Sequence, residues 1–309
     1  MATPLGQLAG IIPPVATPMT EEHEVDVPSL ERLVAFLLDA GVHGLFFLGS
    51  TSETALLTAH QREQVLAVGV AAAGGLVPVI AGVSDPGTAS VIEHARVAAR
   101  LGADGLVLTA PFYLKPNQAE IVAHFRAVRA AVDVPILAYD IPVFVSTKIE
   151  RRTVLAMADE GLIVGLKDSS GDETNFRLLA AETRERAGFA LFTGAELLVD
   201  AAVRAGASGS VPGLGNVDPA GFVHLYDAVV AGDLDTARRE QERLCHLFAI
   251  VQVGMADGMT LAASAFGAFK TALMLRGVIA TNVVGRPLTR YDAPQTRRVQ
   301  EIMAEVGLA

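Results

Sequence analysis

Residues 135–169 read PILAYDIPVFVSTKIERRTVLAMADEGLIVGLKDS, a stretch in which two short apolar segments flank a helix-like region. The segments at 135–142 and 163–169 show no regular alternation of apolar and polar residues. Runs of this kind are typical of parallel strands that are buried on both faces. The stretch therefore predicts one strand–helix–strand unit of a parallel α/β fold.

The same unit recurs along residues 10–215. Successive apolar segments start 27 to 34 residues apart, except the last two, at 190 and 209, which start 19 apart. Eight such units predict a (β/α)8 TIM barrel. A doubly wound sheet is the alternative, but the G-x-G-x-x-G loop that often follows its first strand is absent. The eight segments are GIIPPVATP (10–18), GLFFLGS (44–50), PVIAGVS (78–84), GLVLTAP (105–111), PILAYDIP (135–142), IVGLKDS (163–169), ALFTGAE (190–196) and GSVPGLG (209–215).

The residues between and after the segments predict helices. Stretches 29–40 and 88–101 begin with Ser and Thr as N-caps, and each is followed by glycine. Beyond the last strand, residues 217–309 are too long for one barrel helix. We therefore predict a barrel in residues 1–216, with the last barrel helix and a C-terminal helical extension in 217–309, as a single structural unit. The helices expected there span 220–231, 235–252, 262–275 and 293–306.

Composition narrows the class of protein. The chain has 309 residues and a formal net charge of −10, which disfavours a nucleic-acid-binding surface. No uninterrupted apolar stretch is long enough to predict a membrane span. The single cysteine, Cys245, excludes an internal disulfide, and the N-terminus lacks the pattern of a secretory signal. We therefore expect a cytoplasmic protein.

Lys167 is the first candidate for catalysis, because barrel active sites lie where the strands end. It lies within the apolar segment IVGLKDS. Desolvation in a core strand favours the neutral amine, which can attack a carbonyl carbon. The alternatives are an ion pair with Asp168 or a lysine whose amine reaches out to solvent at the strand end.

Tyr139 lies 28 residues before Lys167, at a comparable place in the preceding segment. Consecutive barrel strands are neighbours, so the two side chains are expected to approach each other at the barrel mouth. A phenol there could pass a proton to or from a carbinolamine or an alkoxide. A core tyrosine with one satisfied hydroxyl is the structural alternative.

A third cluster, GSTSE at 49–53, places a glycine and hydroxyl groups at the end of the second segment. Such donors could bind the carboxylate of a 2-oxo acid, although Ser and Thr often serve only as N-caps here. Other chemistries lack a motif: the seven histidines are scattered without metal-ligand spacing, and no G-x-S-x-G elbow is present. We expect no metal.

In order along the chain, GSTSE, TAPFYLKP, YDIP, GLKDSSGD and GASGSVPGLGN resemble the dihydrodipicolinate synthase / N-acetylneuraminate lyase superfamily of class I aldolases. The similarity extends over nearly the whole chain. It implies a TIM-barrel lyase that acts on a small 2-oxo acid, needs no cofactor and commonly forms a homotetramer, built as a dimer of dimers.

The resemblance also implies roles for single residues. Lys167 matches the Schiff-base lysine and Tyr139 the tyrosine that relays protons. Gly49, Ser50 and Thr51 match the loop that binds the pyruvyl carboxylate, and Ser50 also joins the relay. Two further positions match as well: Tyr113, the aromatic residue that reaches a neighbouring chain's site in the synthases, and Val211, whose backbone carbonyl faces the site.

One departure bears on the substrate. The lysine-pathway synthases carry a carboxylate-binding arginine two residues after the proline of YxxP, and here that position is Phe144. Losing a guanidinium removes a bidentate clamp for a second carboxylate. We therefore expect a lyase that makes or breaks a carbon–carbon bond in a 2-keto-3-deoxy type acid through a Lys167 imine with pyruvate.

Other functions stay open at this point. One is condensation of the 4-hydroxy-tetrahydrodipicolinate synthase type, and another is dehydration of a sugar acid on the same imine. A metal-dependent barrel lyase and a non-catalytic barrel that binds a 2-oxo acid are further alternatives. Binding alone would not require a buried amine.

Overall fold

The structure, a computed structural model, describes residues 5–308. Residues 1–4, which begin the predicted barrel unit and contain most of the N-terminus without a signal pattern, lie outside the described residues. So does residue 309, the end of the predicted extension. Eight parallel strands form one sheet in the order β1-β8-β7-β6-β5-β4-β3-β2. A parallel bridge between Pro14 and Phe46 joins the β1 and β2 sides, so the sheet closes into a barrel. Every strand falls within one of the eight predicted segments: β1 (Gly10–Ile11), β2 (Leu45–Phe47), β3 (Val79–Gly82), β4 (Gly105–Thr109), β5 (Ile136–Asp140), β6 (Gly165–Asp168), β7 (Ala190–Thr193) and β8 (Gly209–Ser210).

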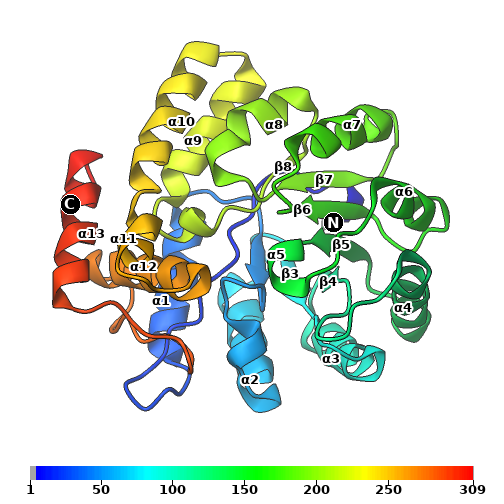
Figure 1. Ribbon diagram of the computed structural model, residues 1–309, viewed down its shortest axis with the longest axis horizontal. Helices are drawn as coiled ribbons and strands as arrows, with labels where there is room; N and C mark the ends of the chain where they lie inside the picture. The colour runs from blue at the N-terminus through cyan, green and yellow to red at the C-terminus, as the bar shows by residue number, and fades with distance from the viewer. Residues whose placement is uncertain (1–4, 309) are drawn as a thin grey trace.

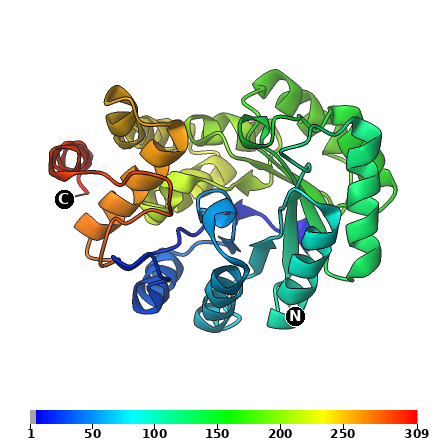
Figure 2. The same ribbon diagram turned by 60° about the horizontal axis from the view of Figure 1, so that its bottom comes forward.

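Helices surround the barrel, and the C-terminal helices gather along one side of it (Figures 1 and 2). The predicted (β/α)8 barrel with a helical extension is therefore confirmed. Within residues 5–308, no helix combines the length and the apolar character needed to cross a membrane. The helices are α1 (Val27–Asp39), α2 (Ala59–Ala73), α3 (Thr88–Leu101), α4 (Gln118–Ala131), α5 (Pro142–Val145), α6 (Arg151–Asp159), α7 (Glu173–Thr183), α8 (Val199–Ala205), α9 (Pro219–Ala231), α10 (Leu234–Leu247), α11 (Ile250–Ala256), α12 (Leu261–Leu275) and α13 (Ala293–Glu305), with short 3₁₀ turns η1 (Leu5–Gln7), η2 (Thr54–Leu56), η3 (Glu196–Leu198) and η4 (Gly213–Asn216).

Three local predictions were wrong. The N-cap of α1 is Asp26 rather than Ser29, and the Asp26 side chain accepts a hydrogen bond from the Ser29 N–H. The N-cap of α3 is Gly87, and the Thr88 hydroxyl pairs with His124 instead. The helix expected at 235–252 is divided into α10 and α11. No proline or glycine separates them; α10 packs mainly on α9 and α11 on α12, so tertiary contacts set this break.

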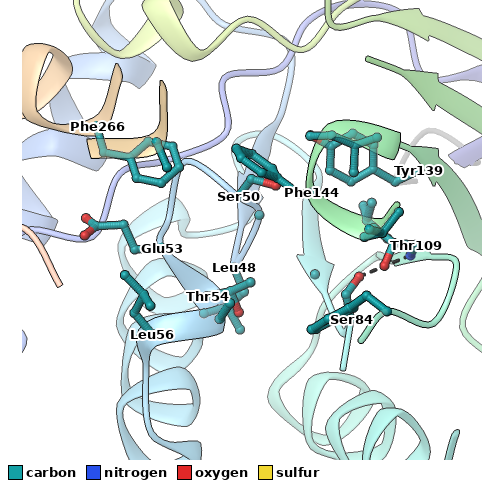
Figure 3. A pocket seen from close by; sticks show the side chains of 18 of the residues that line it. Leu48, Ser50, Glu53, Thr54, Leu56, Ser84, Thr109, Tyr139, Phe144 and Phe266 are labelled. Carbon is teal, nitrogen blue, oxygen red and sulfur yellow. Dashed lines mark hydrogen bonds between the residues drawn. The ribbon is translucent and has the colours of Figure 1, made fainter. Parts of the chain in front are cut away.

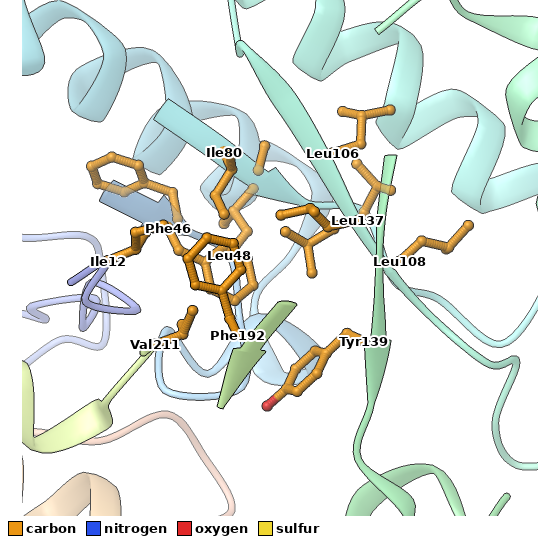
Figure 4. Packing of buried hydrophobic residues seen from close by; sticks show 14 of the residues in the cluster. Ile12, Phe46, Leu48, Ile80, Leu106, Leu108, Leu137, Tyr139, Phe192 and Val211 are labelled. Atoms are coloured by element: carbon orange, nitrogen blue, oxygen red, sulfur yellow. The ribbon is translucent and has the colours of Figure 1, made fainter. Parts of the chain in front are cut away.

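Apolar side chains fill the barrel and continue under the extension. Inside the barrel, Phe46, Leu137 and Phe192 pack together, with Tyr139 at the edge of the cluster and its hydroxyl directed away from it (Figure 4). A second cluster joins the extension to the barrel through residues of β1, η4 and α9–α13. The extension is therefore packed on the barrel by an apolar interface. Members of the second cluster include Ile11, Leu214, Phe222, Leu244, Ile250 and Phe269.

His124, on the buried face of α4, should make stability fall in mild acid. Its Nδ1 lies 2.8 Å from the Thr88 hydroxyl, and burial lowers its pKa to about 4. Between pH 6.5 and 4 the unfolded chain therefore binds more protons at this residue, so the free energy of unfolding falls as pH drops, by at most about 1.4 kcal/mol per pH unit. We expect the melting temperature of His124→Asn to fall less between pH 7 and pH 4.5 than that of the wild type. The exposed His60→Asn variant is the control, and equal losses in all three proteins would contradict the prediction.

Candidate active site

Strand register brings the two main candidates side by side. Thr109 pairs with Tyr139, Tyr139 with Lys167, and Lys167 with Phe192 across β4 to β7. In a barrel, residues at one level of adjacent strands project to the same side of the sheet. The level lies at or next to the carboxyl ends of these strands, where barrel active sites are built.

The Lys167 amine lies over aromatic rings inside the barrel. Its Nζ is 4.2 Å from the centroid of the Tyr139 ring and 5.3 Å from that of Phe46. Lys167 is 6% exposed and Tyr139 4% exposed. Asp168 follows Lys167 in the strand and so projects to its other face, where it accepts a hydrogen bond from the Ser170 N–H. Among the described residues, Lys167 and Asp168 form no ion pair. With its small exposure, the Lys167 side chain stays largely within the barrel rather than extending into solvent.

The loop after β2 is held in place by Ser52. Its buried hydroxyl accepts a hydrogen bond from the Gly49 N–H and donates one to the Val15 carbonyl. Gly49 allows the Phe46 ring to approach, because a Cβ at this position would lie 2.7 Å from that ring. This arrangement fixes the backbone that carries Ser50.

Glu53 ends the same loop in a buried ion pair with Lys270 of α12. Lys270 is fully buried, and its Nζ also donates a hydrogen bond of 2.8 Å to the Val283 carbonyl. The other Glu53 oxygen accepts a hydrogen bond from the Gly285 N–H. Burial lowers the pKa of Lys270 and the Glu53 carboxylate opposes that shift. The loop is thus fastened to the C-terminal extension by charge and hydrogen bonds.

A cavity of about 270 Å³ opens at the carboxyl end of the barrel, with Phe266 at one end and Tyr139 and Thr109 at the other (Figure 3). Four of the predicted site residues line it: Gly49, Ser50, Tyr139 and Phe144. Lys167 is not part of the lining, but its Nζ lies over the Tyr139 and Phe46 rings, which are.

Besides Lys167, three predicted site residues lie away from the cavity lining. Thr51 is half-buried on the loop after β2, and Val211 is buried just beyond β8, where its N–H bonds the Thr193 carbonyl. Tyr113 follows β4 with a left-handed backbone (φ 72°) and is 94% exposed. A single chain therefore does not bring Tyr113 to its own site.

Glu196 is a further ionisable residue here, and we did not select it from the sequence as a site residue. Its carboxylate accepts hydrogen bonds from the Gly213 and Leu214 N–H groups, at 2.8 and 2.9 Å. Burial raises the pKa of Glu196 to about 7, while these hydrogen bonds and the charge of Lys167 act to lower it. Glu196 thus lies in the electrostatic surroundings of Lys167. Its position at the carboxyl end of the seventh apolar segment is the one feature of the sequence that could have predicted it as a site residue.

The fold and the site together are those of a barrel protein with a buried lysine at its mouth. A buried lysine beside a tyrosine at the mouth of a (β/α)8 barrel is an arrangement suited to imine chemistry on a carbonyl compound. Within residues 5–308, no group of three or more His, Cys, Asp or Glu side chains is placed to bind a metal ion.

Comparison with known proteins gives the family. The model of the dihydrodipicolinate synthetase family matches residues 7–306, and the chain belongs to this family, whose members are lyases. A "DapA-like lyase" of Halobacterium salinarum is 34% identical over 99% of this chain and 96% of its own. A 4-hydroxy-tetrahydrodipicolinate synthase of Methanoculleus marisnigri is 31% identical over 96% of this chain and 99% of its own.

Solved structures agree with this assignment. YagE of E. coli K12, a prophage protein of the dihydrodipicolinic acid synthase family determined in complex with pyruvate, matches with a TM-score of 0.91 and 26% identity, over 97% of this chain and 99% of that one. Dihydrodipicolinate synthase from Bacteroides thetaiotaomicron matches with a TM-score of 0.90 and 28% identity, over 96% and 98% of the two chains.

Proposed function

We propose that this protein makes or breaks a carbon–carbon bond in a 2-oxo acid through an imine between Lys167 and pyruvate. The observation that carries the proposal is the buried Lys167 amine, 4.2 Å from the centroid of the Tyr139 ring. Family membership and the pyruvate bound to the related YagE support the same chemistry. Gly49 and Ser50 would bind the pyruvyl carboxylate through the loop after β2, and the resemblance assigns Thr51 and Val211 to the same binding site.

The proposed cycle uses groups of this chain. The neutral Lys167 amine attacks C2 of the 2-oxo acid, water leaves, and the protonated imine becomes an electron sink. In cleavage, Tyr139 takes the proton of the C4 hydroxyl as the C3–C4 bond breaks; C4 leaves as an aldehyde, and the bonding electrons form an enamine on the lysine. Protonation at C3 and hydrolysis release pyruvate and restore the amine. Ser50 would help to relay the proton.

A synthase condensation is the second candidate, because several relatives are named as 4-hydroxy-tetrahydrodipicolinate synthases. Phe144 weighs against it: the side chain lines the cavity at the position where the resemblance expects a carboxylate-binding arginine. A dehydratase acting on the same imine would share Lys167 and differ only in the bond that breaks. A binding function without catalysis leaves the buried amine unexplained.

Borohydride reduction in the presence of pyruvate tests the proposal. We expect a single reduced adduct, located on Lys167 by peptide mass spectrometry, because reduction converts the imine into a stable amine. The other lysines, Lys115, Lys148 and Lys270, serve as internal controls. Absence of an adduct, or an adduct confined to one of those three, would refute the mechanism.

Replacing Tyr139 by phenylalanine should separate imine formation from proton transfer. The ring would still pack on Phe46, whose centroid lies 6.4 Å away, so the fold should be retained. We expect kcat to fall by roughly 10²–10⁴-fold, the usual contribution of general acid–base catalysis. The adduct on Lys167 should still form. Unchanged kcat for cleavage would exclude Tyr139 as the proton relay.

We further propose that Tyr113 serves the site of a neighbouring chain in a tetramer. Its 94% exposure and position on the loop after β4 support this placement.

A further inference from the structure

The cavity beside Tyr139 extends well beyond the space that pyruvate would need. It runs from Tyr139 and Thr109 to Phe266, and Leu288 also lines it, so the C-terminal extension forms part of its wall. Its volume is about 270 Å³, whereas an apolar cavity of about 150 Å³ suffices to bind benzene. The Tyr139 ring lies 4.2 Å from the Lys167 Nζ and also lines the cavity, so a substrate held at Lys167 can extend past Tyr139 and place the part beyond C4 in this space.

The walls of the cavity are apolar. Phe112, Phe144, Val145 and Phe266 line it, together with leucines. Among the described residues, no lysine, arginine or histidine lines it. A second carboxylate would therefore be desolvated without a cation, which is costly.

Apart from Ser50 and Tyr139, the polar residues of the lining are Glu53, Thr54, Ser84 and Thr109, and the Ser84 hydroxyl already accepts a hydrogen bond from the Thr109 N–H. Glu53 lines the cavity, but Lys270 and the Gly285 N–H already engage its carboxylate. The Thr54 and Thr109 hydroxyls are buried at the wall without a partner in the described structure. They could satisfy one or two polar atoms of a ligand. A polyol tail would leave further hydroxyls without partners, each at a desolvation cost.

We propose that the aldehyde portion of the substrate is apolar, an aryl or branched alkyl group of about one ring in size; this inference rests on the proposed lyase function. In the synthetic direction, C3 of the pyruvate enamine attacks the aldehyde carbon. The new carbon–carbon bond forms, the aldehyde oxygen takes a proton, and hydrolysis of the imine releases a 4-hydroxy-2-oxo acid. The reaction needs no further reactant.

Phe144 selects for this group by apolar contact. Its side chain lines the cavity on α5 and is 41% exposed, so replacing it should not unfold the chain. Phe144→Ser removes apolar surface at the cavity and adds a hydroxyl. Leu178→Ser on α7, at 49% exposure, makes a comparable change outside the cavity and is the matched control.

The test measures kcat/KM for pyruvate with benzaldehyde, 3-methylbutanal, D-glyceraldehyde and aspartate semialdehyde, with products identified by mass spectrometry. We expect the first two to exceed the polar aldehydes by roughly tenfold or more, the scale of discrimination in an apolar pocket. Phe144→Ser should lower the benzaldehyde-to-glyceraldehyde ratio by roughly tenfold, and Leu178→Ser should leave it unchanged.

Failure of this inference is distinguishable from failure of the proposed function. A borohydride-trapped adduct on Lys167 combined with equal or better use of the polar aldehydes would overturn the apolar substrate alone. An unchanged ratio in Phe144→Ser would do the same. No adduct on Lys167 would overturn the lyase mechanism and this inference with it.

Discussion

Lys167→Ala is expected to abolish turnover, with a loss of at least about 10³-fold in kcat, because no other group can form the covalent intermediate. The adduct trapped by borohydride should disappear from the same variant. Steady-state cleavage or synthesis with the preferred aldehyde gives the rate, and circular dichroism verifies that the barrel is folded.

Lys167→Arg is the control that keeps the positive charge of the wild-type residue. A guanidinium stays protonated and cannot attack a carbonyl carbon, although it keeps the positive charge at this level of the barrel. We therefore expect the same loss as with alanine. Activity retained in Lys167→Arg but not in Lys167→Ala would show that a cation suffices, and activity retained in both would reject the imine mechanism.

Lys270→Met is expected to have the largest effect on stability. It would leave the Glu53 carboxylate buried without its cation, since Glu53 is 2% exposed. Breaking one side of a buried ion pair typically costs about 3–5 kcal/mol. For a chain of this length we expect the melting temperature to fall by roughly 5–15 °C. Thermal unfolding followed by circular dichroism measures the shift.

Two further variants separate the effect of the unpaired charge on stability from that of the lost side-chain packing. Adding Glu53→Gln to Lys270→Met removes the unpaired charge, while the glutamine oxygen can still accept from the Gly285 N–H, so part of the lost stability should return. Lys115→Met, at an exposed position, should change little. If the double variant melts below Lys270→Met, the loss comes from packing rather than from the unpaired carboxylate.

The amino-acid sequence determined the barrel and its central pair of residues. Eight apolar segments without polar alternation, at near-regular spacing, predict parallel strands that are buried on both faces. The 28-residue separation of Tyr139 and Lys167 equals one strand–helix unit, and their direct pairing between β5 and β6 follows from it. Local periodicity suffices here because neighbouring strands in a barrel are consecutive in the chain.

Tertiary structure decided the features that depend on residues far apart in sequence. Helix α3 begins one residue earlier than expected, with Gly87 as its N-cap, and the Thr88 hydroxyl contacts His124 of α4. The division of α10 from α11 follows their different packing partners. Glu53 and Lys270, separated by more than two hundred residues, meet only because the extension folds back over the barrel. The apolar cavity arises in the same way, from Phe266 of the extension placed opposite Tyr139. Sequence periodicity carries no information on such contacts, because they depend on how whole elements pack.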